Sequence, residues 1–404
     1  MNKTITRTVW LLSMVSLFTD MASEMLYPVM PVYLREIGFS LLWIGILEGC
    51  AEAIAGLSKS YFGALSDRSG KRLPFIQWGY GLSAISKPMM AIFTFKWWIF
   101  GSRTLDRLGK GLRTGARDAL LSSEANDGNK ATVFGFHRSM DTIGAVIGPA
   151  LALLFLYFYP GKYQWLFYLA FLPGILAILC TSFIHEKQAA PSEKKPVSFL
   201  QAFDFWKRSG KEYRRVVIGL LLFALFNSSD LLLLLKIKES GHSDSTVIAI
   251  YIFYNLVFAL LAWPVGRLAD KLGLKKIFLT GLVFFMITYL GFAVIHSFTG
   301  FIILFICYGI YAAATEGIAK AWISITADKR ETATAIGTYT GFQSIAALFA
   351  SSFAGWLWYQ FGPDTAFLSS GIVCGIVIIY FLLQKNTRTE MLHPEISLEG
   401  THGN

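Results

Sequence analysis

Twelve apolar stretches follow one another along this chain, and they constrain its fold more than any other feature. They lie at 8–34, 41–66, 74–95, 97–121, 131–158, 163–184, 215–236, 245–269, 276–296, 299–323, 332–360 and 365–384. A helix needs about 20 mostly apolar residues to cross the hydrocarbon core of a bilayer. The sequence therefore predicts an all-α membrane protein with twelve transmembrane helices.

Composition and charge placement agree with this prediction. Only 15% of the residues are charged and 54% are hydrophobic, whereas soluble domains carry about 25% charged residues. With an even number of spans between the termini, about 23 basic residues fall on one side of the membrane and about five on the other,. This bias predicts a plasma (inner) membrane protein with both termini in the cytoplasm, and it assigns the net charge of +10 to topology and not to nucleic-acid binding.

The chain also divides into two similar parts. A basic connector at 185–214 separates residues 1–184 from residues 215–384, and 385–404 form a tail. Gly63-Ala-Leu-Ser-Asp67-Arg68 recurs as Gly266-Arg-Leu-Ala-Asp270-Lys271. Such a repeat of six spans is typical of duplicated transporter halves. Within the connector, residues 199–206 are predicted to form a short amphipathic helix at the membrane surface.

Several motifs resemble those of the major facilitator superfamily, in particular its twelve-span drug/proton antiporter branch. The most specific is Gly63-x-Leu-x-Asp67-Arg68-x-Gly70-Lys71-Arg72, with a weaker copy at 266–276. Arg107-x-x-Lys110-Gly111 resembles the span-four motif, whose Arg is linked to proton coupling. Residues 28–31 resemble a span-one motif of that branch. The resemblance implies two pseudo-symmetric six-helix bundles and transport by alternating access.

Two of these motifs have a direct physical interpretation. Asp67, near the start of the third span, is predicted to accept hydrogen bonds from helix N-terminal N–H groups and to latch the cytoplasmic ends of the halves. In span five, small residues one turn apart allow close helix packing, and a proline bends the helix. The packing set, Gly135, Gly144, Gly148 and Pro149, resembles the family's span-five motif that is associated with antiporters. The latch set is Gly63, Asp67, Arg68, Gly70, Lys71, Arg72, Gly266 and Asp270.

Charged side chains inside the spans are functional candidates, because each is costly near the bilayer centre unless it is paired or wetted. Asp20 and Glu24 lie one turn apart on span one, and we expect one of them to carry the proton in an electrostatic link to Arg103 or Arg107. The alternative is a permanently ionised structural pair. The full proton-coupling set is Asp20, Glu24, Arg103, Arg107 and Asp141.

The predicted substrate-binding set combines charged groups of the N-terminal half with a few polar groups of the C-terminal half: Glu48, Glu52, Lys110, Arg113, His137, Arg138, Asp230, Tyr254, Glu316 and Gln343. A soft-metal site at Met21 and Met25, beside Asp20 and Glu24, is a separate hypothesis. Ordinary packing explains those methionines better, so no metal ligand is assigned.

These observations predict a proton-coupled exporter of a small molecule, monomeric, without cofactor and without enzymatic activity. The chain contains no Gly-Lys-Ser/Thr phosphate loop, which argues against ATP as the energy source,. Basic residues in span four leave open a proton-coupled importer of an anionic metabolite, and the Met and acid pattern leaves open a transition-metal or metal-chelate transporter. A membrane sensor on the same fold is a further alternative.

Overall fold

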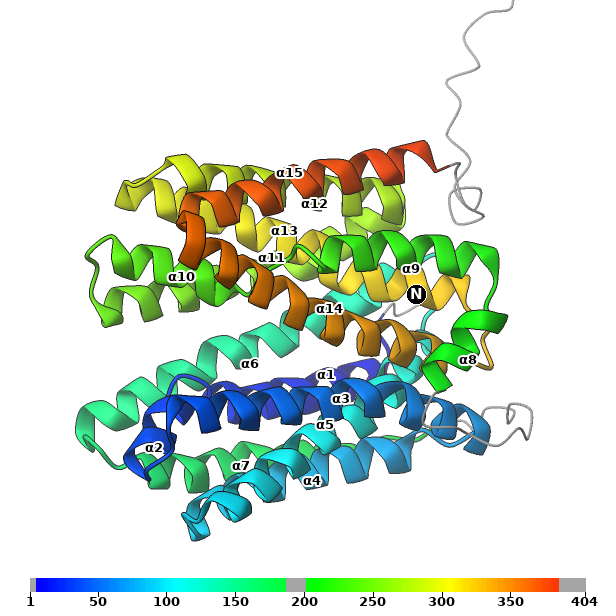
Figure 1. The fold of residues 1–404 in the computed structure, drawn as a ribbon. Helices are drawn as coiled ribbons and strands as arrows, with labels where there is room; N and C mark the ends of the chain where they lie inside the picture. The colour runs from blue at the N-terminus through cyan, green and yellow to red at the C-terminus, as the bar shows by residue number, and fades with distance from the viewer. Residues whose placement is uncertain (1–4, 187–200, 385–404) are drawn as a thin grey trace, which may run out of the picture.

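A computed structural model describes residues 5–186 and 201–384, and the regular elements in this part of the chain are all α-helices (Figure 1). Their bounds are α1 Arg7–Glu24, α2 Met30–Glu36, α3 Leu41–Ser69, α4 Leu73–Ile92, α5 Lys96–Ser123, α6 Lys130–Phe158, α7 Tyr163–Ser182, α8 Gln201–Arg208, α9 Lys211–Ala224, α10 Asp230–Glu239, α11 Asp244–Leu272, α12 Leu274–Val294, α13 Phe298–Thr326, α14 Thr332–Phe361 and α15 Pro363–Leu383.

Two predicted spans are broken, and the continuous helices expected at 8–34 and 215–236 are therefore wrong. The first divides into α1 and α2, and the seventh into α9 and α10. Pro28 lies in the first break and cannot donate an N–H to the helical ladder,. In the second break the Ser229 hydroxyl accepts from the Leu231 N–H and starts a new helix,. The two breaks occupy corresponding positions in the two halves.

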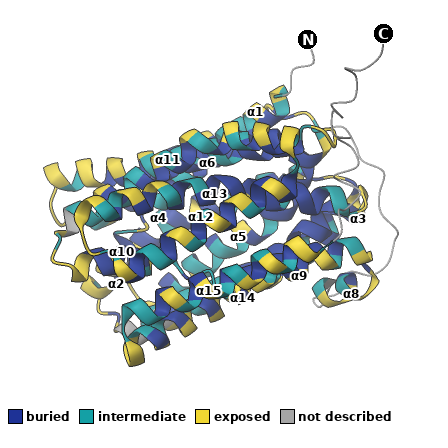
Figure 2. Cartoon of the chain, turned by 90° about the horizontal axis from the view of Figure 1, so that it is seen from above, coloured by how far each residue is buried: buried dark blue, intermediate teal, exposed yellow. Residues whose placement is uncertain are grey.

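The outer surface of the helices is apolar, as a bilayer requires. On α15, Ile372, Ile376 and Ile379 are 57–61% exposed and lie on one side, while buried residues occupy the other side (Figure 2). Among the described residues, six helices are long and apolar enough to cross a membrane by composition alone: Lys130–Phe158, Tyr163–Ser182, Thr246–Leu272, Leu274–Val294, Phe298–Thr326 and Pro363–Leu383. The remaining spans are more polar or are divided into shorter helices.

Helices α1–α7 form the lower group in Figure 1, and α9–α15 form the upper group. The most extensive contacts between the groups pair α6 with α11 and α3 with α14. Glycines allow both approaches: a Cβ on Gly135 would lie 2.5 Å from the Ala262 carbonyl oxygen, and one on Gly337 would lie 2.4 Å from that of Lys59. Gly135 and Gly337 are corresponding residues of the internal repeat, so the two interfaces are built alike.

The connector contributes one short helix, α8, which confirms a helix over 201–206 of the predicted 199–206 segment. Its aromatic side chains pack on α14, with ring centroids of Phe203 and Trp206 at 5.5 and 6.1 Å from that of Phe342. One side of α8 thus faces protein, and contact with the membrane stays a prediction. The rest of the connector between 187 and 200, and the tail at 385–404, lie outside the described residues.

Candidate functional site

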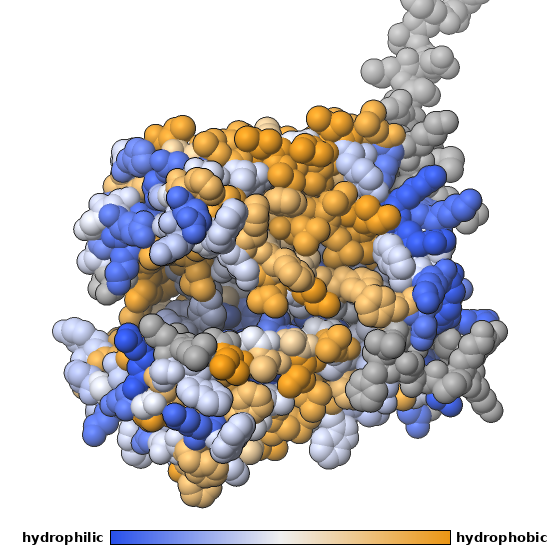
Figure 3. Space-filling view, viewed as in Figure 1, coloured by the Kyte–Doolittle hydropathy of each residue, from blue (hydrophilic) through white to orange (hydrophobic). Residues whose placement is uncertain are grey.

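A cavity of about 620 Å³ lies between the two groups of helices. Figure 3 shows the hollow between them on the left, the end where Figure 1 places α2 and α10. We call this the open end, and the opposite end the closed end. Both broken helices line the cavity, through residues such as Tyr27 and Pro28 beside α1 and Leu231 and Leu235 on α10. Broken helices at matching positions of a repeat commonly mark a substrate site in membrane transporters.

One wall of the cavity carries a network of paired charges. Arg103 on α5 donates two parallel hydrogen bonds of 2.8 Å to the Glu48 carboxylate on α3, and it lies 3.4 Å from Asp106. Asp106 is also 3.6 Å from the Lys87 ammonium. Arg107 lies 3.5 Å from Glu48 and 3.7 Å from Glu52. The network ties α3, α4 and α5 together and gives each of these carboxylates a cation.

This network corrects the predicted link between Asp20 or Glu24 and the arginines of α5. The carboxylates of α3 and Asp106 hold Arg103 and Arg107, so no ion pair joins either arginine to α1 within the described residues. Asp20 and Glu24 nevertheless line the same cavity. Asp20 makes no hydrogen bond or ion pair with another described residue, and Glu24 accepts a 3.1 Å hydrogen bond from the Tyr251 hydroxyl of α11.

Only part of the predicted substrate-binding set lines the cavity. Glu48, Lys110 and Arg113 line the cavity, and Glu52 is the partner of Arg107. The other members, which are not among the described residues lining the cavity, are His137, Arg138, Asp230, Tyr254, Glu316 and Gln343. Arg138 instead bridges Asp141 on its own helix and Glu316 on α13, the latter at 2.6 Å. Asp141, predicted for proton coupling, also accepts from the Ser16 hydroxyl of α1.

Sequence reasoning missed a second ion pair between the groups. Asp118 of α5 lies 2.9 Å from the Lys320 ammonium of α13 and 2.8 Å from Arg117. Glu316 and Lys320 stand one turn apart on α13, so this helix contacts the opposite group through an acid and a base. The signal in the sequence was Lys320 itself, a cation in an apolar span that requires a buried partner. Tyr251 was also missed.

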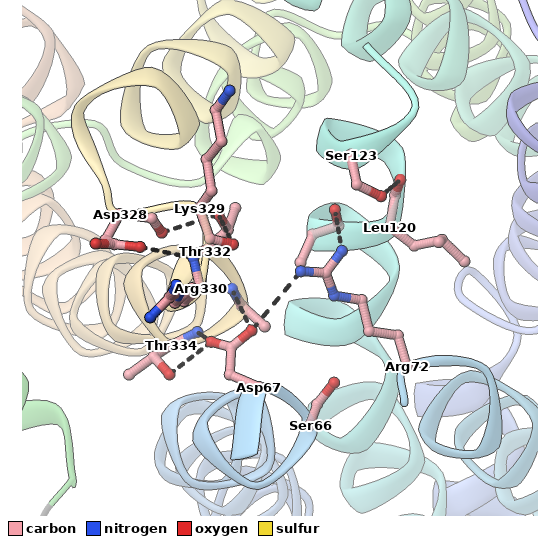
Figure 4. A network of polar contacts seen from close by, with 12 residues as sticks. Ser66, Asp67, Arg72, Leu120, Ser123, Asp328, Lys329, Arg330, Thr332 and Thr334 are labelled. Atoms are coloured by element: carbon pink, nitrogen blue, oxygen red, sulfur yellow. Dashed lines mark hydrogen bonds and ion pairs between the residues drawn. The ribbon is translucent and has the colours of Figure 1, made fainter. Parts of the chain in front are cut away.

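At the closed end, Asp67 forms the contact shown in Figure 4. Its carboxylate accepts from the backbone N–H groups of Ala333 and Thr334 at 3.3 and 2.7 Å, and from the Thr334 hydroxyl at 2.8 Å. Arg72 lies 3.9 Å away. Asp67 does accept hydrogen bonds from N–H groups at the start of a helix, as the sequence predicts. The helix, however, is α14 of the other group and not the adjacent α4.

Asp270 repeats this contact in the opposite direction. From the end of α11, its carboxylate accepts from the N–H groups of Ala131 and Thr132 of α6 at 2.9 and 2.7 Å, and from the Thr132 hydroxyl at 2.5 Å. Neither α6 nor α14 has a side-chain cap of its own. Each aspartate therefore supplies the N-cap that the helix lacks, and it does so from the opposite group.

The glycines of the latch set permit these contacts, whereas two of its basic residues do not take part. A Cβ on Gly63 would lie 2.5 Å from the Ala333 carbonyl oxygen, and one on Gly266 would lie 2.4 Å from that of Ala131. Gly70 ends α3 with a φ of 66°, a conformation that favours glycine. Arg68 and Lys71 are exposed, and their side chains make no ion pair with the described residues. The third basic residue, Arg72, lies near Asp67 and also donates a hydrogen bond of 2.9 Å to the Ala119 carbonyl oxygen.

In the packing set, Gly144 and Gly148 of α6 lie against α1. An added Cβ would come within 2.3 Å of the Leu17 carbonyl oxygen at Gly144, and within 2.5 Å of that of Met21 at Gly148. Pro149 lines the cavity. This close packing fixes the position of Asp20, whose Cβ lies 3.1 Å from the site of a Gly144 Cβ.

Nothing in the described part of the chain supports a metal centre. No group of three or more His, Cys, Asp or Glu side chains is arranged there to hold an ion. Met25 is buried in an apolar cluster with α2 and α7 residues.

We expect Arg103→Met to lower the thermal stability of the purified protein, because Glu48 and Asp106 lose a shared cation. The loss should be about 1–3 kcal/mol, since Glu48 is 36% exposed and water screens part of the pairing,. Arg35→Met, an exposed change on α2, is the matched control. A double change with Glu48→Met should cost less than the sum of the single changes. Equal melting temperatures for Arg103→Met and Arg35→Met would contradict the network's role.

The family model described as Major Facilitator Superfamily matches residues 12–253 and 216–398. An uncharacterized MFS-type transporter of Methanocaldococcus jannaschii is 32% identical over 94% of this chain and 96% of its own length. The multidrug resistance protein MdtG of Escherichia coli is 24% identical over 66% of this chain and 67% of its own length.

Solved structures share the fold. The human organic anion transporter MFSD10 has a TM-score of 0.82 at 16% identity, covering 93% of this chain and 99% of that one. The transporter FucP, solved in an outward conformation, has a TM-score of 0.77 at 11% identity, covering 95% of this chain and 100% of that one. These likenesses show a twelve-span fold of two six-helix bundles.

Proposed function

Because this chain belongs to the Major Facilitator Superfamily, we propose that it is a secondary active transporter that exports a small molecule in exchange for protons. The cavity between the two groups of helices is the substrate site of this proposal, and Asp20 is the proton carrier. Transport is a movement and not a reaction, so the proposal includes no enzymatic step and no cofactor.

The observation that carries the proton assignment is the state of Asp20. It lines the cavity without an ion pair or hydrogen bond to another described residue, unlike Glu48, Glu52 and Asp106. The charges acting most strongly on it are Asp141, Glu24, Arg138 and Lys110. Asp20 is half-buried, and a carboxylate without a fixed partner exchanges a proton at smaller cost than one locked in an ion pair. Substrate entering the cavity then changes the proton affinity of Asp20 directly.

The closed end supports the conformational part of the proposal. Asp67 and Asp270 cap helices of the opposite group, and these hydrogen bonds must break before that end opens. The excess of basic residues on one set of loops supports a cytoplasmic location for the closed end and for both termini,. The cavity of this conformation then opens outward. We propose a monomer in the plasma (inner) membrane, because one chain contains the whole cavity.

Export is favoured by the sequence likeness to MdtG, a multidrug resistance protein. The second candidate is a proton-coupled importer of an anionic metabolite. Its support is the number of basic side chains that line the cavity, namely Lys87, Arg103, Arg107, Lys110, Arg113 and Lys238. The paired network neutralises three of them, and that weighs against a simple anion site.

Inverted membrane vesicles test the exchange. In vesicles acidified by respiration, an added substrate should release protons and raise the fluorescence of an acridine dye that reports the internal pH. A compound panel is added one member at a time, with vesicles lacking the protein as the control. Accumulation of a compound without proton release would contradict coupling. Movement of protons into the vesicles together with the added compound would indicate symport and favour the second candidate.

A further inference from the structure

The charges on the cavity wall, together with Glu52, the partner of Arg107, fall into a paired set and an unpaired set. Glu48, Glu52 and Asp106 each have a cation within 4 Å, supplied by Arg103, Arg107 or Lys87. These groups compensate one another, so a ligand gains little by approaching them and would have to compete with existing ion pairs. The charges that can select a ligand are therefore those without a partner of opposite charge.

Apart from Lys238, which has a contact of its own, two carboxylates and two cations remain. On α1, Asp20 has no partner among the described residues, and Glu24 has the neutral Tyr251 hydroxyl. On α5, Lys110 is exposed and lines the cavity, and its ammonium group makes no ion pair or hydrogen bond with a described residue. Arg113 donates to the Ser83 hydroxyl at 2.9 Å and lies 4.4 Å from the Tyr80 ring centroid, without a carboxylate partner.

Of the two cations, Lys110 is the one that acts on the α1 carboxylates. Lys110 contributes to the electrostatic environment of both Asp20 and Glu24, and Asp20 to that of Lys110. A ligand with a single positive charge at α1 would therefore meet Lys110, and one with a single negative charge at α5 would meet Asp20. Either like-charge contact is unfavourable in a cavity that is partly shielded from water.

The opposite wall of the cavity is mostly apolar. Leu231, Leu234 and Leu235 lie on one side of α10, and Val247 and Ile248 extend this surface on α11. Leu231 and Leu235 remain 48% and 40% exposed although they line the cavity. Burial of such surface by a ligand is favourable, and a cavity of about 620 Å³ is in the usual range for drug-sized ligands,.

We propose that the substrate is an amphipathic zwitterion, with its cationic group at Asp20 and Glu24, its anionic group at Lys110 and Arg113, and its apolar body against α10 and α11. The assignment rests on the proposed function, because it names the substrate class of the same cavity. It is also compatible with exchange, because a proton on Asp20 competes with the cationic group of the ligand and leaves the anionic subsite unchanged.

A charge-sorted ligand set tests the class without requiring the physiological substrate. Amino acids and short peptides with branched or aromatic side chains are used in four forms on each scaffold: the zwitterion, the C-terminal amide, the N-acetyl acid and the N-acetyl amide. Binding is measured as thermal stabilisation of the purified wild-type protein. Stabilisation should be largest for zwitterions. Equal or larger stabilisation by a singly charged form, or no stabilisation by any zwitterion, overturns the proposal.

Lys110→Gln tests the anionic subsite with the best zwitterion found and its amide. Binding of the zwitterion should weaken by about tenfold or more, the cost of one charge-assisted contact, while the amide should bind as well as before or more tightly. Lys96→Gln, on the same helix outside the cavity, should change neither. Unchanged zwitterion binding in Lys110→Gln overturns the assignment.

Failure of this assignment and failure of the proposed exchange are distinguishable. The binding measurements need no membrane and no gradient, so proton release by a singly charged compound would leave the exchange intact and remove only the zwitterion class. Conversely, zwitterion binding without any substrate-dependent proton release would remove the exchange and leave the ligand class.

Discussion

Asp20→Asn is expected to reduce proton-coupled transport to the level of membranes that lack the protein. The change preserves size and removes only the charge and the exchangeable proton. Asp20 makes no ion pair with a described residue, so the folded state loses little. In the vesicle assay, substrate-dependent proton release should disappear, and binding of a cationic or zwitterionic ligand should lose its pH dependence.

Glu24→Gln is the matched control for Asp20→Asn, because Glu24 lies one turn away in the same cavity and is held by the Tyr251 hydroxyl. It should weaken transport but preserve its dependence on the proton gradient. Thermal unfolding of both variants checks that they are folded. Proton release by Asp20→Asn at the wild-type rate would assign coupling to another group, with Glu24 and Asp141 the next candidates.

Asp67→Ala is expected to produce the second largest effect. The change removes three hydrogen bonds to a buried carboxylate at the N-terminus of α14. Hydrogen bonds to charged groups contribute about 1.5–3 kcal/mol each, and about 3 kcal/mol already shifts a conformational equilibrium by roughly a hundredfold. The closed end should therefore spend most of its time open, and turnover should fall by a similar factor because the return step becomes unfavourable.

The structure provides two comparisons for Asp67→Ala. Asp127→Ala removes a half-exposed carboxylate at the same end, whose one ion-pair partner among the described residues is Lys130 of its own group, and it should transport like the wild type. Asp270→Ala removes the corresponding contact at α6 and should resemble Asp67→Ala. Wild-type turnover in both aspartate variants, with the proteins folded, would mean that these caps only stabilise the helices.

The general architecture could be predicted from the sequence because it depends on local patterns. Apolar length predicts the spans, and the copied motif at Gly63 and Gly266 predicts two similar halves. The break at Pro28 also had a local signal, which the apolar run concealed. The break before Asp230 had a weaker one, because serines are common in loops as well as at helix starts.

The partners of the charged groups could not be predicted in the same way, because pairing depends on which helices meet. The sequence predicts a link from Asp20 or Glu24 to Arg103 or Arg107, but Glu48 on α3 pairs with both arginines. Asp67 was placed at the next helix along the chain, whereas it caps α14, which is adjacent only in three dimensions. The internal repeat could have supplied these partners. Because the two halves are alike, α3 contacts α14 in the way that α11 contacts α6. The contact of Asp270 with the start of α6 therefore implies the contact of Asp67 with the start of α14.

The central claim is that the two ends of the cavity open alternately, and paired distance measurements test it most directly. The starting protein has its four native cysteines replaced. One pair of spin labels is attached at the closed end, at the exposed positions Lys71→Cys and Lys329→Cys. A second, separate pair is attached at the open end, at Glu36→Cys and Glu239→Cys. Double electron–electron resonance would then compare the wild type with Asp67→Ala. We predict that the closed-end distance increases while the open-end distance decreases. Two distances that stay fixed, or that change in the same direction, would contradict alternating access.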